Sequence, residues 1–142
     1  MKKVMLIGKT GCGKTTLSQA LQKELITYKK TQAVEYYRDI IDTPGEYIEN
    51  RVYYNALIVS SYDCDIIALV QDCTSDENFF PPNFSSIFCK PVIGIITKID
   101  LCTCNRKINI ATNYLINSGV SEIFKVSSIN NEGIDKIREI LQ

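Results

Sequence analysis

The sequence contains no histidine among its 142 residues, and its charges cancel. Without histidine there can be no Ser-His-Asp or Cys-His catalysis and no histidine-ligated metal ion. Lysine plus arginine and aspartate plus glutamate both number 16, so the formal net charge is +0. A neutral chain offers no electrostatic basis for binding nucleic acid or an anionic membrane. Any catalysis must therefore use carboxylates, lysine, threonine, backbone amides or a nucleotide-bound metal.

Long apolar runs are also missing. The apolar segments at 65–70 and 92–96 are far too short to span a bilayer. The opening Met1-Lys2-Lys3 leads into a short apolar segment that Lys9 and nearby glycines interrupt, unlike a signal peptide. We therefore expect a cytoplasmic protein without a membrane partner. The length and the 45% apolar content predict a single domain, residues 1–142, with one hydrophobic core.

The cysteines do not follow a metal-binding spacing. No Cys-x-x-Cys pair is present, and Cys102-x-Cys104 is too short for the usual structural zinc knuckle. In a reducing compartment such residues are expected to be small, mostly buried thiols. We therefore expect reduced side chains at all six positions: Cys12, Cys64, Cys73, Cys89, Cys102 and Cys104.

Short apolar segments alternate with segments of helical periodicity along the whole chain. This alternation predicts a mostly parallel sheet with helices on both faces, and ligands bind at the edge where such strands end. Two short pieces, 33–36 and 38–42, are expected to form a tight antiparallel hairpin. Further strands are expected at 3–8, 65–71, 91–97 and 123–126, helices at 14–25, 48–61, 105–117 and 133–141, and a loop at 72–86.

A phosphate-binding loop follows the first strand. Residues 8–15 read Gly-Lys-Thr-Gly-Cys-Gly-Lys-Thr, a complete match to G-x-x-x-x-G-K-[ST]. Glycines let successive backbone N–H groups converge on phosphate oxygens, and the following helix adds its positive end. Lys14 is expected to reach the β- and γ-phosphates, and the Thr15 hydroxyl to ligate Mg²⁺. The expected nucleotide contacts here are Gly8, Lys9, Thr10, Gly11, Cys12, Gly13, Lys14, Thr15 and Thr16.

Two more strand ends carry suitable chemistry. The strand over 40–42 ends in Asp42-x-x-Gly45, which predicts a Mg²⁺ carboxylate opposite Thr15 and an amide that approaches the γ-phosphate. The strand over 94–97 ends in Thr97-Lys98-x-Asp100. A carboxylate at Asp100 can accept both N–H groups on the Watson–Crick edge of guanine, which adenine lacks. GTP/GDP is therefore favoured over ATP/ADP, with Lys98 along the base and the Ser127 and Ser128 amides facing guanine O6.

In their order and on these elements, the motifs at 8–15, 42–45, 97–100 and 127–128 resemble those of the Ras-like GTPases. That resemblance implies an α/β fold: a Ras-like P-loop NTPase three-layer α/β/α sandwich, mostly parallel, with one short antiparallel edge strand. More narrowly, the stretches 42–50 and 30–36 look like the EutP/PduV family. This implies Mg²⁺ with a purine nucleotide, ethanolamine or propanediol utilisation, and a place in the cytoplasm or at a bacterial microcompartment, with shell or enzyme proteins as partners.

The chain departs from the Ras-like pattern at four places. The first switch loop is short, and Thr31 is the candidate for its phosphate- and Mg²⁺-sensing threonine; the alternative is a surface threonine. Glu46 stands where a water-orienting glutamine is usual, so we expect slow hydrolysis, well below ~1 s⁻¹. Thr97 stands where an asparagine is usual. That asparagine ties the base-binding loop to the phosphate-binding loop, and threonine can make only part of this connection. Residues 76–82 replace most of a crossover helix, and their aromatic residues either pack on the sheet or form a partner-binding patch.

Three functions fit these residues. The first is a nucleotide-dependent switch or assembly factor that hydrolyses GTP slowly, with Lys14, Glu46 and Thr31 as catalytic candidates and Thr15, Asp42 and Thr31 around Mg²⁺. The second is a phosphotransferase that uses ATP on a small carboxylate such as acetate. The third is a docking module that binds nucleotide without hydrolysing it.

Overall fold

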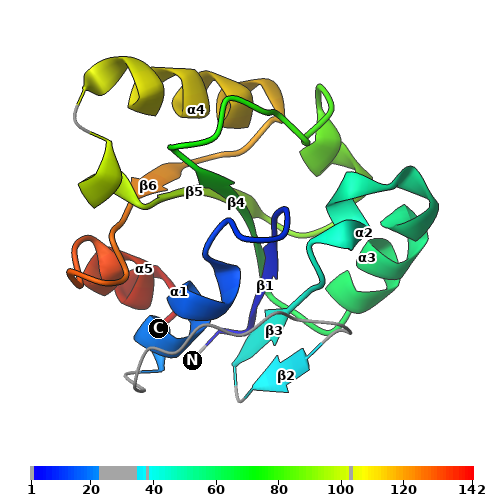
Figure 1. Cartoon of the computed structure of the whole chain (residues 1–142). Coiled ribbons are helices and arrows are strands. Elements are labelled where there is room, and N and C mark those ends of the chain that lie inside the picture. The colour runs from blue at the N-terminus through cyan, green and yellow to red at the C-terminus, as the bar shows by residue number, and fades with distance from the viewer. Residues whose placement is uncertain (1, 23–34, 38, 103) are drawn as a thin grey trace.

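A computed structural model describes residues 2–22, 35–37, 39–102 and 104–142. Strands and helices alternate along the chain, as the sequence predicts (Figure 1). The strands are β1 (Val4–Ile7), β2 (Glu35–Tyr37), β3 (Ile40–Asp42), β4 (Ile66–Asp72), β5 (Val92–Thr97) and β6 (Ile123–Lys125). The α-helices are α1 (Lys14–Leu21), α2 (Glu46–Glu49), α3 (Tyr54–Ser61), α4 (Asn105–Asn117) and α5 (Ile134–Ile140). Short 3₁₀ helices are η1 (Arg51–Tyr53), η2 (Phe84–Ile87) and η3 (Ile99–Leu101).

Six strands form one sheet in the order β2-β3-β1-β4-β5-β6. All neighbours are parallel except β2 and β3, whose antiparallel pairing makes β2 an edge strand. The predicted α/β class, parallel sheet and short antiparallel edge strand are confirmed. Since β1 lies between β3 and β4, the loops that follow these strands gather at one edge of the sheet.

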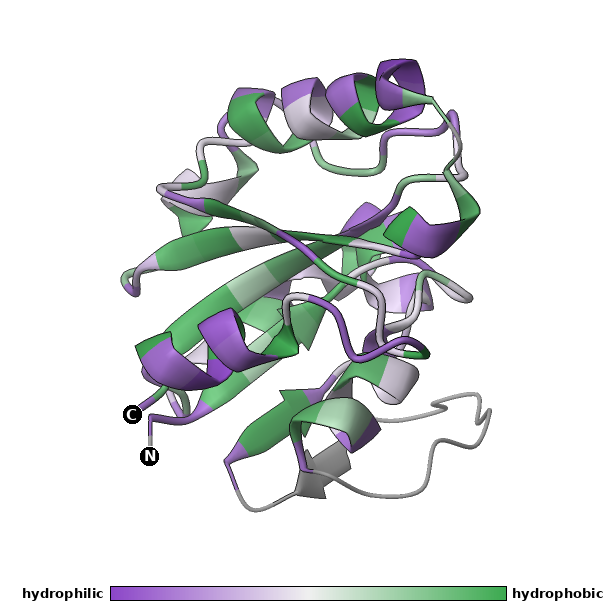
Figure 2. Cartoon of the chain, turned by 90° about the vertical axis from the view of Figure 1, so that its left-hand side faces the viewer, coloured by the Kyte–Doolittle hydropathy of each residue, from purple (hydrophilic) through white to green (hydrophobic). Residues whose placement is uncertain are grey.

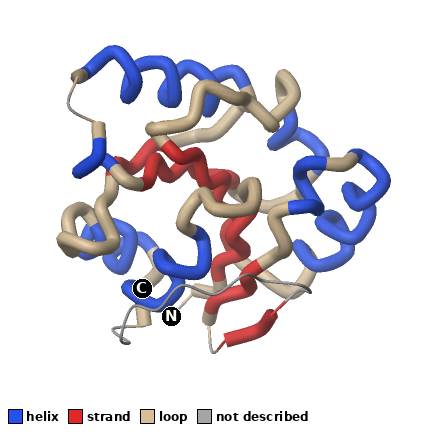
Figure 3. The backbone as a smooth tube through the Cα atoms, viewed as in Figure 1, coloured by secondary structure: helices blue, strands red, loops and turns tan. Residues whose placement is uncertain are grey.

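Helices cover both faces of the sheet, which makes three layers (Figure 3). On one face α1 and α5 pack on side chains such as Leu6 and Ile95, and on the other α3 and α4 pack on side chains such as Ile7 and Ile96. Strands β1, β4 and β5 are buried along their whole length. This burial on both faces explains their almost continuous apolar sequences (Figure 2). No helix among the described residues is long and apolar enough to cross a bilayer.

The expected single helix over 48–61 is wrong. It is interrupted at Asn50, whose backbone is extended at φ −135° and ψ 122°, so α2 ends before η1 and α3 begin. The Asn50 side chain accepts the Val52 N–H at 3.1 Å and thereby caps the new helical turn. The apolar pattern continues through this break, which is why periodicity alone missed it.

The long connection after β4 packs down on the sheet. Phe80, Phe84 and Phe88 are buried, and the Phe84 ring meets the Phe88 ring edge-on at a centroid distance of 5.5 Å. Of the two alternatives for residues 76–82, the packing alternative is therefore confirmed for Phe80. The predicted helix over 14–25 is confirmed up to Leu21, and its last three residues lie outside the described ranges.

Candidate functional site

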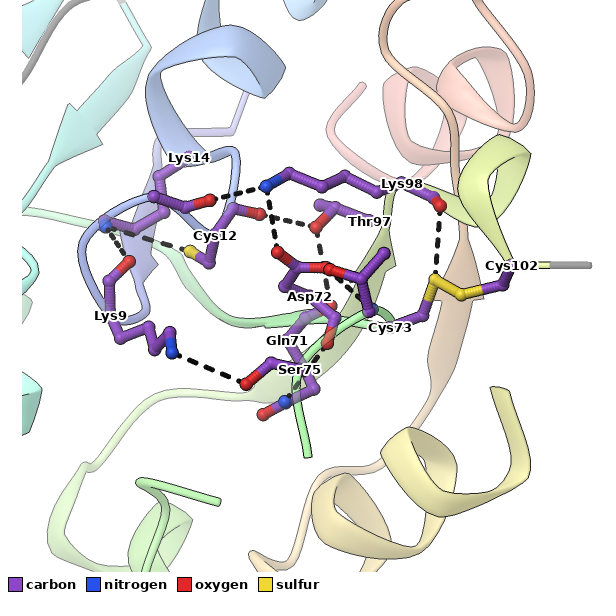
Figure 4. Close-up of polar contacts among 12 residues, drawn as sticks. Lys9, Cys12, Lys14, Gln71, Asp72, Cys73, Ser75, Thr97, Lys98 and Cys102 are labelled. Carbon is purple, nitrogen blue, oxygen red and sulfur yellow. Dashed lines mark hydrogen bonds and ion pairs between the residues drawn. A yellow bond between two sulfur atoms is a disulfide. The ribbon is translucent and has the colours of Figure 1, made fainter. Parts of the chain in front are cut away.

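The glycine-rich loop joins β1 to α1 at the edge where the parallel strands end. Gly13 has a φ of 99°, a left-handed conformation that favours glycine. Lys14 follows it and is 6% exposed. Its ammonium group turns back over the loop and donates to the Lys9 carbonyl at 3.2 Å (Figure 4). The loop thus holds a buried cation over its own backbone.

The predicted Mg²⁺ ligands from two elements lie together. The Thr15 hydroxyl, in the first turn of α1, donates to Asp42 Oδ2 at the end of β3 over 2.7 Å. A hydroxyl and a carboxylate are the hard oxygen ligands that Mg²⁺ prefers. No group of three or more His, Cys, Asp or Glu side chains suited to a metal is found in the described part of the chain. This pair would therefore suit a Mg²⁺ ion that takes its other ligands from phosphate and water. Thr31, the third predicted ligand, lies outside the described residues.

The turn after β3 lies directly against the glycine-rich loop. A Cβ on Gly45 would overlap the backbone of Thr10, so only glycine permits this approach. One turn further on, Glu49 accepts the Thr10 N–H at 3.3 Å. The predicted catalytic residue Glu46 is exposed at the start of α2 and not the carboxylate that meets the loop. Sequence reasoning missed Glu49, because its contact with Thr10 joins residues 39 apart in the sequence and no motif marks it.

The strand-end motif on β5 is tied to the loop through both of its first two residues. The Thr97 hydroxyl donates to the Cys12 carbonyl at 2.5 Å, and Lys98 Nζ donates to the Gly11 carbonyl at 2.7 Å (Figure 4). The expectation that threonine makes part of the usual asparagine bond is consistent with this contact. Lys98 itself has a φ of 61°, uncommon for a residue with a side chain.

Lys98 has a second partner that the sequence did not reveal. Its ammonium group lies 2.8 Å from the Asp72 carboxylate at the end of β4. The Asp72 side chain is 8% exposed, and its other oxygen accepts both the backbone N–H and the hydroxyl of Thr74. A largely buried carboxylate with three donors is well satisfied. Asp72 thus holds the Lys98 side chain across the loop.

A cavity of about 100 Å³ opens beside this motif. Asp100 borders it and accepts a hydrogen bond of 2.7 Å from the Ser127 hydroxyl, which fixes one carboxylate oxygen. Ser127 is buried, whereas Ser128 lines the cavity. Its other lining residues are Gly13, Thr16, Thr97, Lys98, Leu101 and Ile129. The structure therefore brings the predicted base-site residues together around one cavity.

The far side of the loop is held by the segment after β4. Lys9 Nζ donates to the Ser75 hydroxyl at 3.4 Å and lies 5.2 Å from the centroid of the Phe79 ring, a cation–π contact. These contacts keep the Lys9 side chain on the outside of the loop, away from Lys14.

Two of the six thiols are not free, which corrects the expectation of six reduced cysteines. Cys73 and Cys102 form a disulfide across 29 residues. Cys12 and Cys64 are buried thiols, as expected, while Cys89 and Cys104 are exposed. Burial raises the pKa of the Cys12 thiol, so this loop cysteine is a poor nucleophile. Burial likewise raises the pKa of Cys64 to about 11.

A sheet of this order, with a glycine-rich loop after β1 and aspartates at the ends of β3 and β4, defines a P-loop protein with the GTPase fold. Solved structures agree. A bacterial selenocysteine-specific elongation factor, EF-Sec, superposes with a TM-score of 0.68 at 20% identity, covering 97% of this chain and 27% of that chain. GDP-bound Roco2 from Methanosarcina barkeri gives a TM-score of 0.68 at 20% identity, with 99% and 47% covered. The chain spans less than half of either protein.

The chain belongs to the PduV-EutP family, described as "Ethanolamine utilisation - propanediol utilisation", whose model matches residues 1–142. It is 42% identical over 137 residues to the propanediol utilization protein PduV of Citrobacter freundii, covering 96% of this chain and 91% of that protein. It is 32% identical over 144 residues to a protein of Escherichia coli K12 named probable acetate kinase EutP, with 99% and 89% covered. The expected family is confirmed.

Proposed function

We propose that this protein binds a purine nucleoside triphosphate with Mg²⁺ on the loop at 8–15 and hydrolyses it slowly. The observation that carries the proposal is the Thr15–Asp42 contact of 2.7 Å, beside the buried ammonium of Lys14. This contact supports the proposal, because two oxygen atoms of the kind that ligates Mg²⁺ and one ammonium group would then surround the bound phosphates. Loop amides and Lys14 would bind and orient those phosphates, and Mg²⁺ would neutralise charge that develops on them.

The base site supports GTP over ATP as the preferred nucleotide. The Ser127 hydroxyl occupies Asp100 Oδ1, so the carboxylate is held in one orientation at the border of the cavity. A fixed carboxylate is suited to accept the paired N–H groups of guanine. Lys98 is held by Asp72 and the Gly11 carbonyl, so its alkyl stem can lie along one side of the base. The remaining contacts would come from the lining residues Gly13, Thr16, Thr97 and Ser128.

Slow turnover follows from the groups near the loop. Glu46 is exposed, and Glu49 points a second carboxylate at the Thr10 amide. Carboxylates close to a triphosphate repel it and do not orient water as a glutamine does. We infer an intrinsic rate well below ~1 s⁻¹, as in related domains without a supplied arginine. Thr31 remains the candidate switch threonine.

A second function is phosphoryl transfer to a small carboxylate such as acetate. It is favoured by relatives that carry the name probable acetate kinase and that share most of this chain. Glu46 would then position the acceptor of the phosphoryl group and not a water molecule. In either case the setting is ethanolamine or propanediol utilisation, with one nucleotide-binding domain over 1–142. It would lie in the cytoplasm or at a microcompartment, with shell or enzyme proteins as partners.

One set of measurements separates these functions. GDP, GTP, ADP and ATP are titrated calorimetrically in Mg²⁺, and turnover is then followed with and without acetate. We expect tighter binding of guanine nucleotides, slow phosphate release and no acetyl phosphate. Lys14→Ala should abolish binding, whereas Lys136→Ala, an exposed lysine on α5, should not. Asp100→Ala should weaken GDP but not ADP.

Other outcomes have distinct meanings. Formation of acetyl phosphate, together with similar affinities for guanine and adenine nucleotides, would show that the protein is an acetate kinase and not a GTP hydrolase. Binding without turnover under either condition would leave a docking module. No affinity for any of the four nucleotides would overturn the proposal.

A further inference from the structure

A disulfide adjoins the turn that borders the cavity proposed to hold the base. Cys73 follows β4 and Cys102 follows η3, and their Cα atoms are 6.6 Å apart (Figure 4). The bond joins the end of one strand to the 3₁₀ turn that carries Asp100. It therefore connects two segments that both contribute to the candidate site.

Cys73 is bound to the first two residues of the strand-end motif. Its backbone N–H donates to the Thr97 carbonyl at 3.2 Å, and its sulfur lies 3.2 Å from the Lys98 carbonyl oxygen. The residue before it is Asp72, which pairs with the Lys98 ammonium. Any movement of Cys73 relative to Lys98 would therefore disturb the contact of its sulfur with the Lys98 carbonyl and the ion pair between Asp72 and Lys98.

Cys102 ends the turn that carries Asp100. Its N–H donates to the Ile99 carbonyl at 3.2 Å, and the Ile99 N–H donates to the Val126 carbonyl at 3.3 Å. Within the described part of the chain, two hydrogen bonds join this turn to other elements besides the disulfide: the Ile99–Val126 bond and the Ser127–Asp100 bond. The disulfide is thus the covalent link between the Asp100 turn and the residue that follows β4.

We propose that Cys73–Cys102 is a thiol–disulfide redox site that sets nucleotide affinity by fixing the Asp100 turn. The inference rests on the proposed nucleotide binding at this site. In the oxidised form the turn is preorganised to read the base. Reduction frees it, and nucleotide must then pay for ordering the turn on binding. Disulfides of cytoplasmic proteins are as a rule catalytic or redox-sensing, which agrees with such a role.

The chemistry is exchange with a dithiol. Cys73 is 1% exposed and Cys102 is partly exposed, so a thiolate attacks the Cys102 sulfur. The S–S bond breaks, a mixed disulfide forms on Cys102, and Cys73 leaves as a thiolate that takes up a proton. The second thiol of the reductant then attacks the mixed disulfide, releases Cys102 and leaves with the new disulfide. Two electrons pass to the protein, and a disulfide oxidant reverses the process.

The remaining thiols provide controls. Cys12 and Cys64 are buried, so they compete poorly for the reductant. Cys104 is exposed and only two residues from Cys102, so a Cys104→Ser background removes it as an exchange partner. Cys89 is exposed outside the candidate site, and Cys89→Ser is the matched control for Cys102→Ser.

The test measures GDP affinity in the Cys104→Ser protein after oxidised glutathione and after dithiothreitol, with the bond quantified by peptide mass mapping. We expect reduction to weaken GDP binding about tenfold, equal to about 1.4 kcal/mol. Cys89→Ser should respond in the same way. Cys102→Ser and Cys73→Ser should bind as the reduced form does under both conditions. Amide hydrogen exchange over 98–102 should rise on reduction, while exchange over 105–117 should not.

Equal GDP affinity in two forms proven oxidised and reduced would overturn the inference and leave the proposed function standing. Failure of the bond to form with the oxidant would overturn it too. No GDP or GTP binding in either form would instead overturn the proposed function. In that case, amide hydrogen exchange over 98–102 that is the same before and after reduction would also overturn the redox site. Exchange that becomes faster on reduction would show that the disulfide fixes the Asp100 turn even without a nucleotide.

Discussion

Glu49 accepts a hydrogen bond from the backbone N–H of Thr10 at 3.3 Å, so a carboxylate occupies an amide of the glycine-rich loop. In the proposed function this amide faces phosphate. A γ-phosphate and the Glu49 carboxylate cannot share one N–H without strong repulsion. A triphosphate must therefore displace Glu49 from the loop.

Glu49→Gln should consequently tighten binding of GTP more than of GDP. We expect a few-fold gain for the triphosphate, because removal of one exposed charge changes the electrostatic free energy by about 1 kcal/mol or less. Calorimetric titration with both nucleotides at low and high salt measures the gain. Glu139→Gln, an exposed glutamate on α5, serves as the matched control. An equal gain for GDP and GTP would contradict the displacement of Glu49 by the γ-phosphate.

Thr15→Ala should raise the Mg²⁺ concentration needed for tight nucleotide binding. It removes the hydroxyl that lies 2.7 Å from Asp42 Oδ2 and leaves Lys14 in place. We expect a loss of about tenfold or more in affinity at limiting Mg²⁺ and a smaller loss when Mg²⁺ is replaced by EDTA. Titration of nucleotide across Mg²⁺ concentrations measures this. Thr112→Ala on α4 is the control: it removes a hydroxyl that donates to the Ile108 carbonyl of its own helix, and it should leave the Mg²⁺ dependence unchanged.

Asp72→Asn should weaken guanine-nucleotide binding through Lys98 without touching the phosphates. The amide cannot hold the Lys98 ammonium as the carboxylate does at 2.8 Å, so the side chain is less well fixed across the loop. We expect a three- to tenfold rise in the dissociation constants of GDP and GTP, and a similar ratio between the two. Asp76→Asn, an exposed change on the following segment, should have no effect. A loss confined to GTP would show that Asp72 acts on the γ-phosphate.

The stability of the protein should fall as the pH rises from about 9 to about 11. Burial raises the pKa of the Cys64 thiol from 9.0 to about 11, with Asp65 and Asp63 adding to the effect. The unfolded state therefore loses this proton first, so the contribution of the Cys64 thiol to stability is complete below about pH 9 and is lost as the pH rises to about 11. The shift corresponds to roughly 1 to 3 kcal/mol at the upper end of that window.

Thermal unfolding at pH 8.5 and pH 10.5 measures this fall in stability. Lysines and tyrosines also titrate in the window, so Cys64→Ala is compared with the parent chain. The decline should be smaller in Cys64→Ala, which has no thiol to ionise on unfolding. Parallel declines in the two proteins would show that Cys64 ionisation does not contribute.

The order of the motifs on the chain was enough to predict the fold and which strand ends meet at the candidate site. Helix α4 was predicted with its observed ends, Asn105 and Asn117, because a strong apolar period is followed by Gly119. The conformation of a motif such as 8–15 is determined by its local sequence, so Thr15 could be predicted to lie opposite Asp42 without a structure.

Residues that act through packing could not be predicted in this way. Glu49 accepts the N–H of Thr10, which lies 39 residues away in the sequence, and no local pattern marks this contact. Asp72 meets Lys98 because β4 and β5 are paired in register. Cys73 and Cys102 are 29 residues apart, and no spacing rule joins them. Long-range pairing of this kind is decided by the sheet and not by neighbouring residues.

Where Gly45 lies against the backbone of Thr10, two lengths of main chain meet with no side chain between them. A side chain at such a contact could change rotamer and absorb a displacement, whereas close-packed backbone transmits it. Any shift of the loop at Thr10 therefore moves Gly45 and the first turn of α2 with it. The loop and this short helix are therefore expected to shift together, and α2 leads directly into η1 and α3, where Val52 and Val59 are exposed.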